Sequence, residues 1–195
     1  IEAFEYLKQA KHIGKVVITQ LPLVTDDGCY VVSGGLGYLG RLVAKALIEQ
    51  GARKLVLLSS SRSELPEDWE LEVRPAVERC DVGDMEAVRR VMGRYDNIRG
   101  IVHAAGVLAD RTIGELTEQD FRTVYRPKVD GARYLHECSL GLDLDFFVLF
   151  SSIASGLGSS GQANYAAANG CLDALAEERA RARLPGLSVR WGAWA

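Results

Sequence analysis

Tyr30-Val31-Val32-Ser33-Gly34-Gly35-Leu36-Gly37-Tyr38-Leu39-Gly40 is the stretch that decides the fold of this chain. It joins a short run of strand-forming residues to glycines spaced G-x-G-x-x-G, and residues 41–50 continue with the apolar spacing of a helix. Strand, glycine turn and helix in this order are typical of a dinucleotide-binding unit. Gly35 is expected to allow the tight turn, Gly37 to let the backbone approach a pyrophosphate, and Gly40 to bring the helix close to the strand.

Strand and helix patterns alternate along the rest of the chain. Several strands are continuously apolar, as expected for strands covered on both faces. We therefore predict an α/β fold with a Rossmann-type, doubly wound parallel sheet in three layers. Between residues 59 and 80, where a full crossover helix is expected, only 66–72 offers a helix, of about two turns. The expected strands are 29–33, 54–59, 76–80, 100–104, 145–151 and 187–191, and the expected helices are 39–50, 85–95, 117–125, 129–138 and 161–183.

Composition narrows the class of protein. The chain has 195 residues, which suits one domain with a substantial core, and its formal net charge of −3 is spread without a basic stripe, so neither nucleic acid nor a membrane surface is expected as a partner. No apolar run approaches the roughly 18 residues that span a bilayer. Four scattered cysteines without a C-x-x-C pair predict reduced thiols, no metal site and a cytoplasmic protein. The missing initiator Met suggests a piece excised from a longer chain.

Cofactor choice can be inferred from the end of the second strand. That strand continues into Ser59, Ser60, Ser61 and Arg62, with no carboxylate before Glu64. An NAD site usually has an acidic residue here, whereas hydroxyls and a guanidinium suit a 2′-phosphate. NADPH is therefore the expected cofactor, and an ordinary solvated loop is the alternative.

Two further strand ends lie where ligands sit in open α/β sheets. Asp81 and Val82 follow the third strand, and Asp81 is expected to bind an adenine amino group or to cap a helix, although Asp84 suits the cap better. His103 ends the fourth strand and is interpreted as structural rather than catalytic. The residues expected at the cofactor from these motifs are Ser33, Gly34, Gly35, Leu36, Gly37, Tyr38, Leu39, Gly40, Ser59, Ser60, Arg62, Asp81, Val82, His103, Ala104, Ala105 and Gly106.

A hydroxyl pair near the end of the chain points to carbonyl chemistry. Ser152 closes the run Phe150-Ser151-Ser152, Tyr165 follows thirteen residues later, and Asn169 stands four residues after the tyrosine. A serine and a tyrosine at this spacing are able to grip a carbonyl oxygen and protonate it. Beside a dinucleotide fingerprint, the pair predicts hydride transfer.

Taken together, these motifs resemble the ketoreductase domain of modular polyketide synthases, a branch of the short-chain dehydrogenase/reductase superfamily. The resemblance covers about residues 28–195. Most short-chain dehydrogenases carry Tyr-x-x-x-Lys. This chain has Asn169 at the last position of that motif, and its candidate lysine, Lys128, lies 37 residues upstream of Tyr165. That exchange is the hallmark of the polyketide branch. The motifs that carry the resemblance are Ser-Gly-Gly-Leu-Gly-Tyr-Leu-Gly, Cys-Asp-Val, His-Ala-Ala-Gly-Val-Leu, Pro-Lys-Val, Leu-Phe-Ser-Ser and Gly-Gln-Ala-Asn-Tyr-Ala-Ala-Ala-Asn.

The resemblance implies a role for each catalytic residue. Tyr165 would donate the proton, Ser152 would hold the substrate carbonyl, and Lys128 would ease proton release and hold the nicotinamide ribose, so that Lys128 and Tyr165 also join the cofactor set. Asn169 would position Lys128 and a proton-relay water. The implied activity is NADPH-dependent reduction of the β-ketone of an acyl chain tethered to an acyl carrier protein. A catalytically silent ketoreductase-like domain and a free-standing short-chain reductase on a soluble ketone are the alternatives.

The resemblance also bears on stereochemistry. B-type ketoreductases, which make the D-alcohol, carry Leu-Asp-Asp where this chain has Leu108-Ala109-Asp110. The tryptophan expected of the A-type is Leu157 here, and Asn164 suits the B-type. We therefore expect a B-type enzyme, with stereocontrol by Asp110, Leu157, Gln162 and Asn164.

The resemblance divides the chain into three parts. Residues 1–21 resemble the closing segment of an enoylreductase domain, 22–28 form a linker, and 29–195 form the NADPH-binding catalytic domain. Ketoreductases of this branch continue past this point into a lid and a last strand, so the domain is expected to be truncated at its C-terminal end. The expected partners are the acyl carrier protein, the enoylreductase and other domains of the same synthase.

Overall fold

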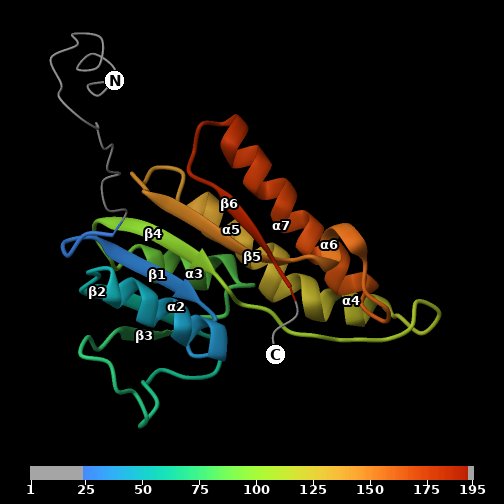
Figure 1. Ribbon diagram of the computed structural model, residues 1–195, viewed down its shortest axis with the longest axis horizontal. Coiled ribbons are helices and arrows are strands. Elements are labelled where there is room, and N and C mark those ends of the chain that lie inside the picture. Colours follow the sequence, from blue (N-terminus) through green and yellow to red (C-terminus); the bar gives the residue numbers. More distant parts are fainter. Residues whose placement is uncertain (1–23, 193–195) are drawn as a thin grey trace, which may run out of the picture.

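A computed structural model describes residues 24–192, so the expected enoylreductase-like head and the first two residues of the expected linker lie outside the described residues. One parallel sheet runs through the domain in the order β3-β2-β1-β4-β5-β6 (Figure 1). This order confirms the predicted Rossmann-type α/β fold. The strands are β1 (Cys29–Ser33), β2 (Lys54–Ser59), β3 (Ala76–Arg79), β4 (Ile98–His103), β5 (Phe146–Ser152) and β6 (Leu187–Trp191); the α-helices are α2 (Tyr38–Glu49), α3 (Met85–Met92), α4 (Glu118–Tyr125), α5 (Gly131–Cys138), α6 (Ala154–Leu157) and α7 (Ala163–Arg181).

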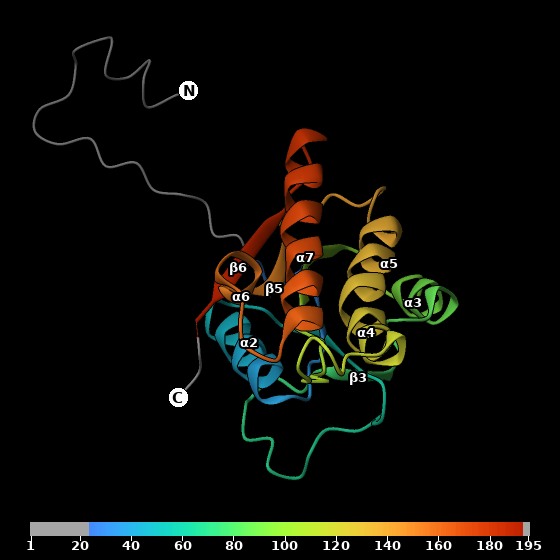
Figure 2. The ribbon, with the colours of Figure 1, turned by 90° about the vertical axis from the view of Figure 1, so that its right-hand side faces the viewer.

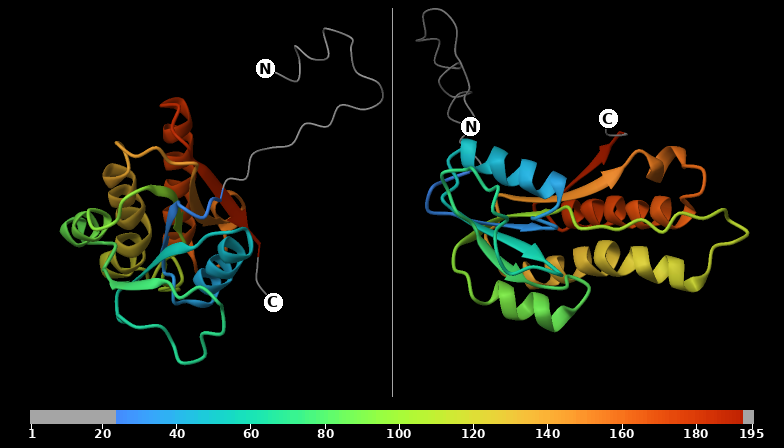
Figure 3. Two further views of the ribbon diagram at one scale, coloured as in Figure 1. Left: turned by 90° about the vertical axis from the view of Figure 1, so that its left-hand side faces the viewer. Right: turned by 90° about the horizontal axis from the view of Figure 1, so that it is seen from below.

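The sheet separates two apolar cores. Helices α3, α5 and α7 cover one face, where Val31, Ile101 and Leu172 belong to one buried cluster (Figures 2 and 3). Helix α2 covers the other face, where Val32 and Leu57 belong to the second cluster. Neighbouring residues on a strand point to opposite faces, so a fully buried strand such as β1 feeds both cores.

The strand order reverses between β1 and β4. From β1 the chain proceeds to β2 and β3 on one side and later to β4, β5 and β6 on the other. The connections that follow β1 and β4 therefore leave the sheet in opposite directions. This opens a crevice at the carboxyl ends of β1 and β4, and ligands bind in such crevices of open α/β sheets.

The connection from β2 to β3 contains no helix. The short helix expected over residues 66–72 is wrong: the backbone makes a single turn there, with the Trp69 N–H donating to the Pro66 carbonyl. The Trp69 side chain is buried against the α2 face of the sheet, and its Nε1 donates to the Val73 carbonyl. One large aromatic side chain thus anchors the connection that a crossover helix was expected to fill.

The helices around residues 126–130 and after β5 differ from the expected ones. A π-helical turn, η1 (Arg126–Asp130), joins α4 to α5, where two separate helices were predicted. Pro127 lacks the N–H that a regular helix needs at this point, and single π turns occur frequently at functional sites. Helix α6 was not predicted, since its four residues are too few to show a helical pattern. Asp84 caps α3 by accepting from the Glu86 and Ala87 N–H groups, as the sequence indicated.

None of the helices within residues 24–192 is both long and apolar enough to cross a bilayer. In the same part of the chain, no three His, Cys, Asp or Glu side chains gather as a metal site would need.

Candidate active site

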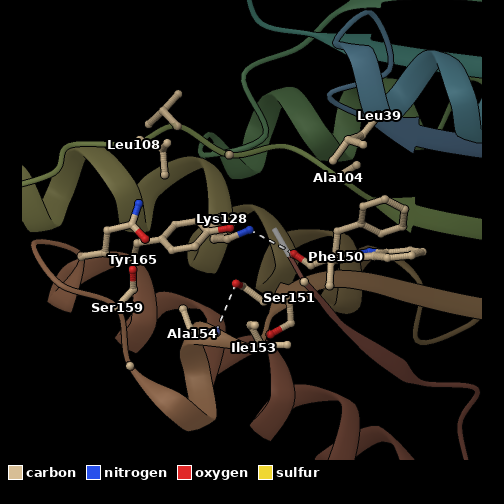
Figure 4. A pocket seen from close by; sticks show the side chains of 17 residues that line it. Leu39, Ala104, Leu108, Lys128, Phe150, Ser151, Ile153, Ala154, Ser159 and Tyr165 are labelled. Atoms are coloured by element: carbon tan, nitrogen blue, oxygen red, sulfur yellow. Dashed lines mark hydrogen bonds between the residues drawn. The ribbon is translucent and has the colours of Figure 1, made fainter. Parts of the chain in front are cut away.

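A cavity of about 680 Å³ opens at the carboxyl ends of β4 and β5 (Figure 4). It brings together three of the four predicted catalytic residues, Lys128, Ser152 and Tyr165, although they come from η1, β5 and α7. From the predicted cofactor set, Leu39, Ala104 and Gly106 also line it, and Gln162 does so from the predicted stereocontrol set. The hydroxyl pair and the fingerprint segment therefore meet in one cavity.

Lys128 and Tyr165 lie side by side in this cavity (Figure 4). The Nζ atom of Lys128 lies 5.4 Å from the centre of the Tyr165 ring and donates to the Phe150 carbonyl at 3.0 Å. Lys128 is only 5% exposed, and this burial lowers the pKa of its ammonium to about 8. A Cβ added to Gly106 would lie 3.5 Å from Nζ, so the amine also adjoins the loop after β4.

Within residues 24–192, the Ser152 hydroxyl accepts one hydrogen bond and donates none. It ends β5, and its Oγ accepts from the Ala154 N–H at 3.2 Å, at the start of α6. The hydroxyl proton has no acceptor among the described residues. Ser152 is thus oriented as a donor toward the cavity that it lines.

Asn169 is fully buried in α7, one helical turn after Tyr165, and does not line the cavity. Its Nδ2 donates to the Tyr165 carbonyl at 2.8 Å, while its Oδ1 is buried and has no hydrogen-bond partner within residues 24–192. No hydrogen bond joins Asn169 to Lys128 among the described residues, and the Lys128 ammonium donates to the Phe150 carbonyl. A buried acceptor without a partner is costly, and an ordered water is the usual solution.

The start of α7 is held by Asn164. This side chain is fully buried, and its Nδ2 donates to the carbonyls of Ala109 at 2.8 Å and Asp120 at 3.3 Å. Its Oδ1 accepts from the Tyr165 N–H at 2.8 Å. Asn164 therefore faces backbone rather than the cavity, and ties the loop after β4 to the residue that carries the phenol.

The glycine turn differs from its expected form in one detail. The left-handed conformation lies at Gly34, with φ of +66°, whereas Gly35 is required for lack of space, since a Cβ there would lie 2.7 Å from Leu57 Cβ. Gly40 is as predicted: a Cβ there would lie 2.2 Å from the Gly34 carbonyl oxygen, so only glycine lets α2 pack this closely. Gly37 caps α2, and Leu36 and the exposed Tyr38 lie around it. The first N–H groups of α2 are thereby presented at the crevice, as an anion site requires.

Arg62 lies in the connection after β2. Ser59 Oγ accepts from the N–H groups of Ser61 and Arg62 and so shapes this turn, beside the exposed Ser60. Within the described part of the chain, the Arg62 guanidinium has no hydrogen-bond or ion-pair partner. The exposed Arg62 guanidinium is therefore accessible to solvent and to any ligand at this turn.

Asp81 and Val82 lie at the end of β3, apart from the cavity. Asp81 accepts from the Gly83 N–H at 2.9 Å and from Arg126 at 2.9 Å. Its carboxylate therefore organises the backbone between β3 and η1. Val82 is buried, with its side chain against Gly131.

His103 and Ser33 are enclosed in the protein. They lie at the ends of β4 and β1, and their side chains are hydrogen-bonded to each other at 2.7 Å. Burial lowers the pKa of His103 to about 4. The interpretation of His103 as structural agrees with this burial. Ala105 donates its N–H to Ser33 Oγ at 3.3 Å and so joins the same group.

The remaining stereocontrol residues lie on two sides of the cavity. Asp110 is exposed on the loop after β4 and accepts from Gln162 Nε2 at 2.9 Å. Leu157 is 84% exposed on α6, beside the cavity-lining Gly158. Asp110 is therefore coupled to the cavity through Gln162, and Leu157 leaves its side without a bulky ring.

Sequence patterns did not reveal several residues that line the cavity. Phe150 and Trp191 pack with ring centres 5.2 Å apart, one on β5 and the other on β6. Asp173 on α7 accepts from Ser155 of α6 and from Ser188 and Arg190 of β6, and so joins three elements around the cavity. The serine and arginine partners are remote in sequence, so no local motif could have indicated them.

Comparisons with known proteins support one family. The family model described as KR domain matches residues 28–195. The chain is 44% identical over 207 aligned residues to a phenolphthiocerol synthesis polyketide synthase type I of Mycobacterium marinum, covering 98% of this chain and 10% of that protein. It is 43% identical over 207 residues to a Mycobacterium tuberculosis synthase of the same kind that is named inactive, covering 98% of this chain and 13% of that protein.

Solved structures of ketoreductases also resemble this chain. An A-type ketoreductase from a modular polyketide synthase is 41% identical, with a TM-score of 0.82 over 88% of this chain and 38% of that one. A ketoreductase domain from the bacillaene assembly line is 38% identical, with a TM-score of 0.79 over 92% of this chain and 47% of that one. The chain thus spans about a tenth of the length of the curated relatives described above.

Proposed function

This chain belongs to the ketoreductase domain family of modular polyketide synthases, and from that premise we propose that it reduces the β-ketone of an acyl chain with NADPH. The observation that carries the proposal is one cavity lined by Lys128, Ser152 and Tyr165, with Leu39 of the fingerprint helix at its edge. Carbonyl reduction requires a proton donor, a hydrogen-bond donor to the carbonyl oxygen, a nearby cation and a nucleotide-binding segment, and this cavity brings the four together.

The protein's part in the reaction is to orient and protonate the carbonyl oxygen. Ser152 would donate its free hydroxyl proton to that oxygen, because its Oγ already accepts from the Ala154 N–H. Tyr165 would transfer its phenolic proton to the same oxygen as negative charge develops there. NADPH, when bound, supplies the hydride for the carbonyl carbon.

Lys128 and Asn169 would assist proton transfer from the Tyr165 phenol. The Lys128 ammonium lies beside the Tyr165 ring, where a positive charge stabilises the phenolate left by proton transfer. The buried Asn169 Oδ1 faces no protein donor among the described residues, which supports a water that carries the next proton toward Lys128 and Tyr165.

Cofactor choice follows from the connection after β2. The Arg62 guanidinium and the hydroxyls of Ser59 and Ser60 would hold the 2′-phosphate, while the start of α2 would hold the pyrophosphate. The exposed turn carries no carboxylate that would repel this phosphate before Glu64. These residues fit NADPH better than NADH.

The product proposed is the D-alcohol of a B-type enzyme. Asp110 and Gln162 form a polar wall on one side, and Leu157 leaves the other side without an indole. One solved relative is an A-type ketoreductase with a TM-score of 0.82, so this proposal rests on these side chains and not on the backbone fold.

The proposed setting is a multidomain synthase in the cytoplasm. Its curated relatives are polyketide synthases many times longer than this chain, which supports neighbouring domains as partners. We infer that the substrate arrives on an acyl carrier protein and that residues 1–21 close an enoylreductase domain before a 22–28 linker.

A catalytically silent domain is the second candidate, because one relative of similar identity is named inactive. Silent relatives usually lose catalytic side chains, whereas here Lys128, Ser152 and Tyr165 line one cavity. A free-standing reductase on a soluble ketone is less well supported by relatives of this size.

The test is turnover of a β-ketoacyl thioester, followed by loss of NADPH absorbance. Tyr165→Phe keeps the ring and removes only the proton donor, so kcat is expected to fall by on the order of 10² or more while NADPH binding is retained. Tyr134→Phe on α5, outside the cavity, is the matched control and is expected to keep wild-type turnover. A wild-type chain that binds NADPH and never oxidises it would favour the silent domain.

A further inference from the structure

His103 links the nucleotide side of the site to the catalytic lysine. Its imidazole is 1% exposed, and both ring nitrogens have partners: Nδ1 lies 2.7 Å from Ser33 Oγ, and Nε2 lies 2.8 Å from the Lys128 carbonyl oxygen. Ser33 and Lys128 are 95 positions apart in the chain but are separated here by one ring. The buried imidazole therefore bridges the end of β1 and η1.

The hydrogen bonds around His103 have a defined direction. A carbonyl oxygen only accepts, so Nε2 must carry the proton and donate to Lys128. Nδ1 of the neutral ring then accepts from the Ser33 hydroxyl, whose oxygen in turn accepts from the Ala105 N–H. Burial and the nearby Lys128 charge keep the pKa of His103 near 4, so the ring is neutral at physiological pH.

The other end of this chain of hydrogen bonds lies in the π-helical turn. Lys128 belongs to η1, and the next helix begins at Gly131 directly against the imidazole. A Cβ on Gly131 would lie 3.1 Å from His103 Cε1 and 2.8 Å from a Val82 methyl group. The backbone around Lys128 is thus packed against the ring and hydrogen-bonded to it.

We propose that His103 is a positioning residue for Lys128: its Nε2–H holds the Lys128 carbonyl, and this fixes where the ammonium lies against Tyr165 and Phe150. The proposal rests on the role given to Lys128 in the proposed function. It assigns the two ring nitrogens different importance. A histidine that only fills the core would depend on volume and on both hydrogen bonds equally.

Two amide substitutions separate these possibilities. The side-chain nitrogen of Gln in His103→Gln can reach the position of Nε2, whereas the shorter side chain in His103→Asn reaches only the position of Nδ1. His103→Gln is therefore expected to keep the bond to Lys128, and His103→Asn to keep only the bond to Ser33. Both are amides of similar polarity, so each is the control for the other.

The main readout is the titration of Lys128 without cofactor or substrate. Lysine is labelled with ¹³C at Cε in the full chain, and the Lys128 signal is identified by its absence in Lys128→Arg. His103→Asn is expected to raise the pKa of Lys128 by about one unit or more toward its ordinary value of about 10.4, and His103→Gln to leave it close to that of the wild type. Dissociation constants for NADPH are expected to follow, with about a tenfold loss in His103→Asn only.

Equal behaviour of the two variants, or an unchanged Lys128 titration in His103→Asn, would overturn the proposal. If either variant fails to unfold cooperatively, the wild type decides alone: ¹⁵N spectra must show His103 protonated at Nε2 and not at Nδ1. The opposite tautomer refutes the assignment. Because none of these measurements needs turnover, they stand even if the wild-type chain proves inactive in the thioester assay.

Discussion

Lys128→Met is expected to stabilise the folded chain near neutral pH while it abolishes reduction. The ammonium of Lys128 is buried beside Tyr165 and has no carboxylate among the groups that affect its pKa. A buried cation without a counter-ion opposes folding, because it loses its hydration. Methionine occupies a similar volume without the charge.

The size of the effect follows from the pKa of Lys128, which burial lowers from 10.5 to about 8. At about 1.36 kcal/mol per pKa unit, this difference corresponds to a cost of about 3 kcal/mol for keeping the lysine protonated in the folded state. Methionine also loses the hydrogen bond to the Phe150 carbonyl, worth about 1 kcal/mol. The net expectation at pH 7 is a gain of about 2 kcal/mol.

The stability difference between Lys128→Met and the wild type should depend on pH. Between pH 8 and 10.5 the unfolded chain binds the Lys128 proton more tightly than the folded chain, so wild-type stability rises with pH in that window. Below pH 8 both states are protonated and the cost is fully present. The advantage of Lys128→Met should therefore shrink above pH 8 and reverse near about pH 10.

Urea unfolding of both proteins at about pH 7 and about pH 9.5 measures this difference. Lys45→Met is the control, since the Lys45 side chain is 55% exposed on α2 and its replacement should give no pH-dependent change. The reasoning is refuted if Lys128→Met is less stable than wild type at pH 7, or if the difference between them is the same at both pH values.

Two further predictions concern specificity. NADPH should bind at least about tenfold more tightly than NADH, and Arg62→Ala should weaken NADPH binding and spare NADH binding, while Arg53→Ala at the opposite end of β2 should change neither. Fluorescence titration of the wild type and both variants measures these dissociation constants for each cofactor, and equal losses for both cofactors in Arg62→Ala would show that Arg62 is only a loop residue. Asp110→Ala should erode the excess of D-alcohol more than it slows reduction, because such discrimination rests on about 1–3 kcal/mol, and a predominantly L-alcohol from the wild type on chiral chromatography would contradict the B-type assignment.

Local patterns were enough to predict the sheet and most of its helices. The bounds of β1, β2 and β6 coincide with the expected ones, because each is a short strand-forming run between turn residues. The short connection after β2 was expected to hold a helix and instead depends on Trp69, whose burial against a distant helix leaves no local signal.

The motifs likewise indicated the residues of the site but not their contacts. The spacing of Ser152 and Tyr165 and the glycine pattern follow from chemistry that short segments can express. The partners of Lys128 could not be inferred in this way, since Phe150 accepts from its ammonium and His103 donates to its carbonyl from other strands.

The physical reason is the range over which each interaction acts. Backbone preference and apolar periodicity operate within a few residues, so the sequence by itself determined the order of elements, the nucleotide turn and the identity of the hydroxyl pair. Burial and hydrogen-bond direction depend on every neighbouring element at once. The lowered pKa of Lys128, the neutral ring of His103 and the unpartnered Oδ1 of Asn169 were therefore decided only when the sheet and η1 packed together.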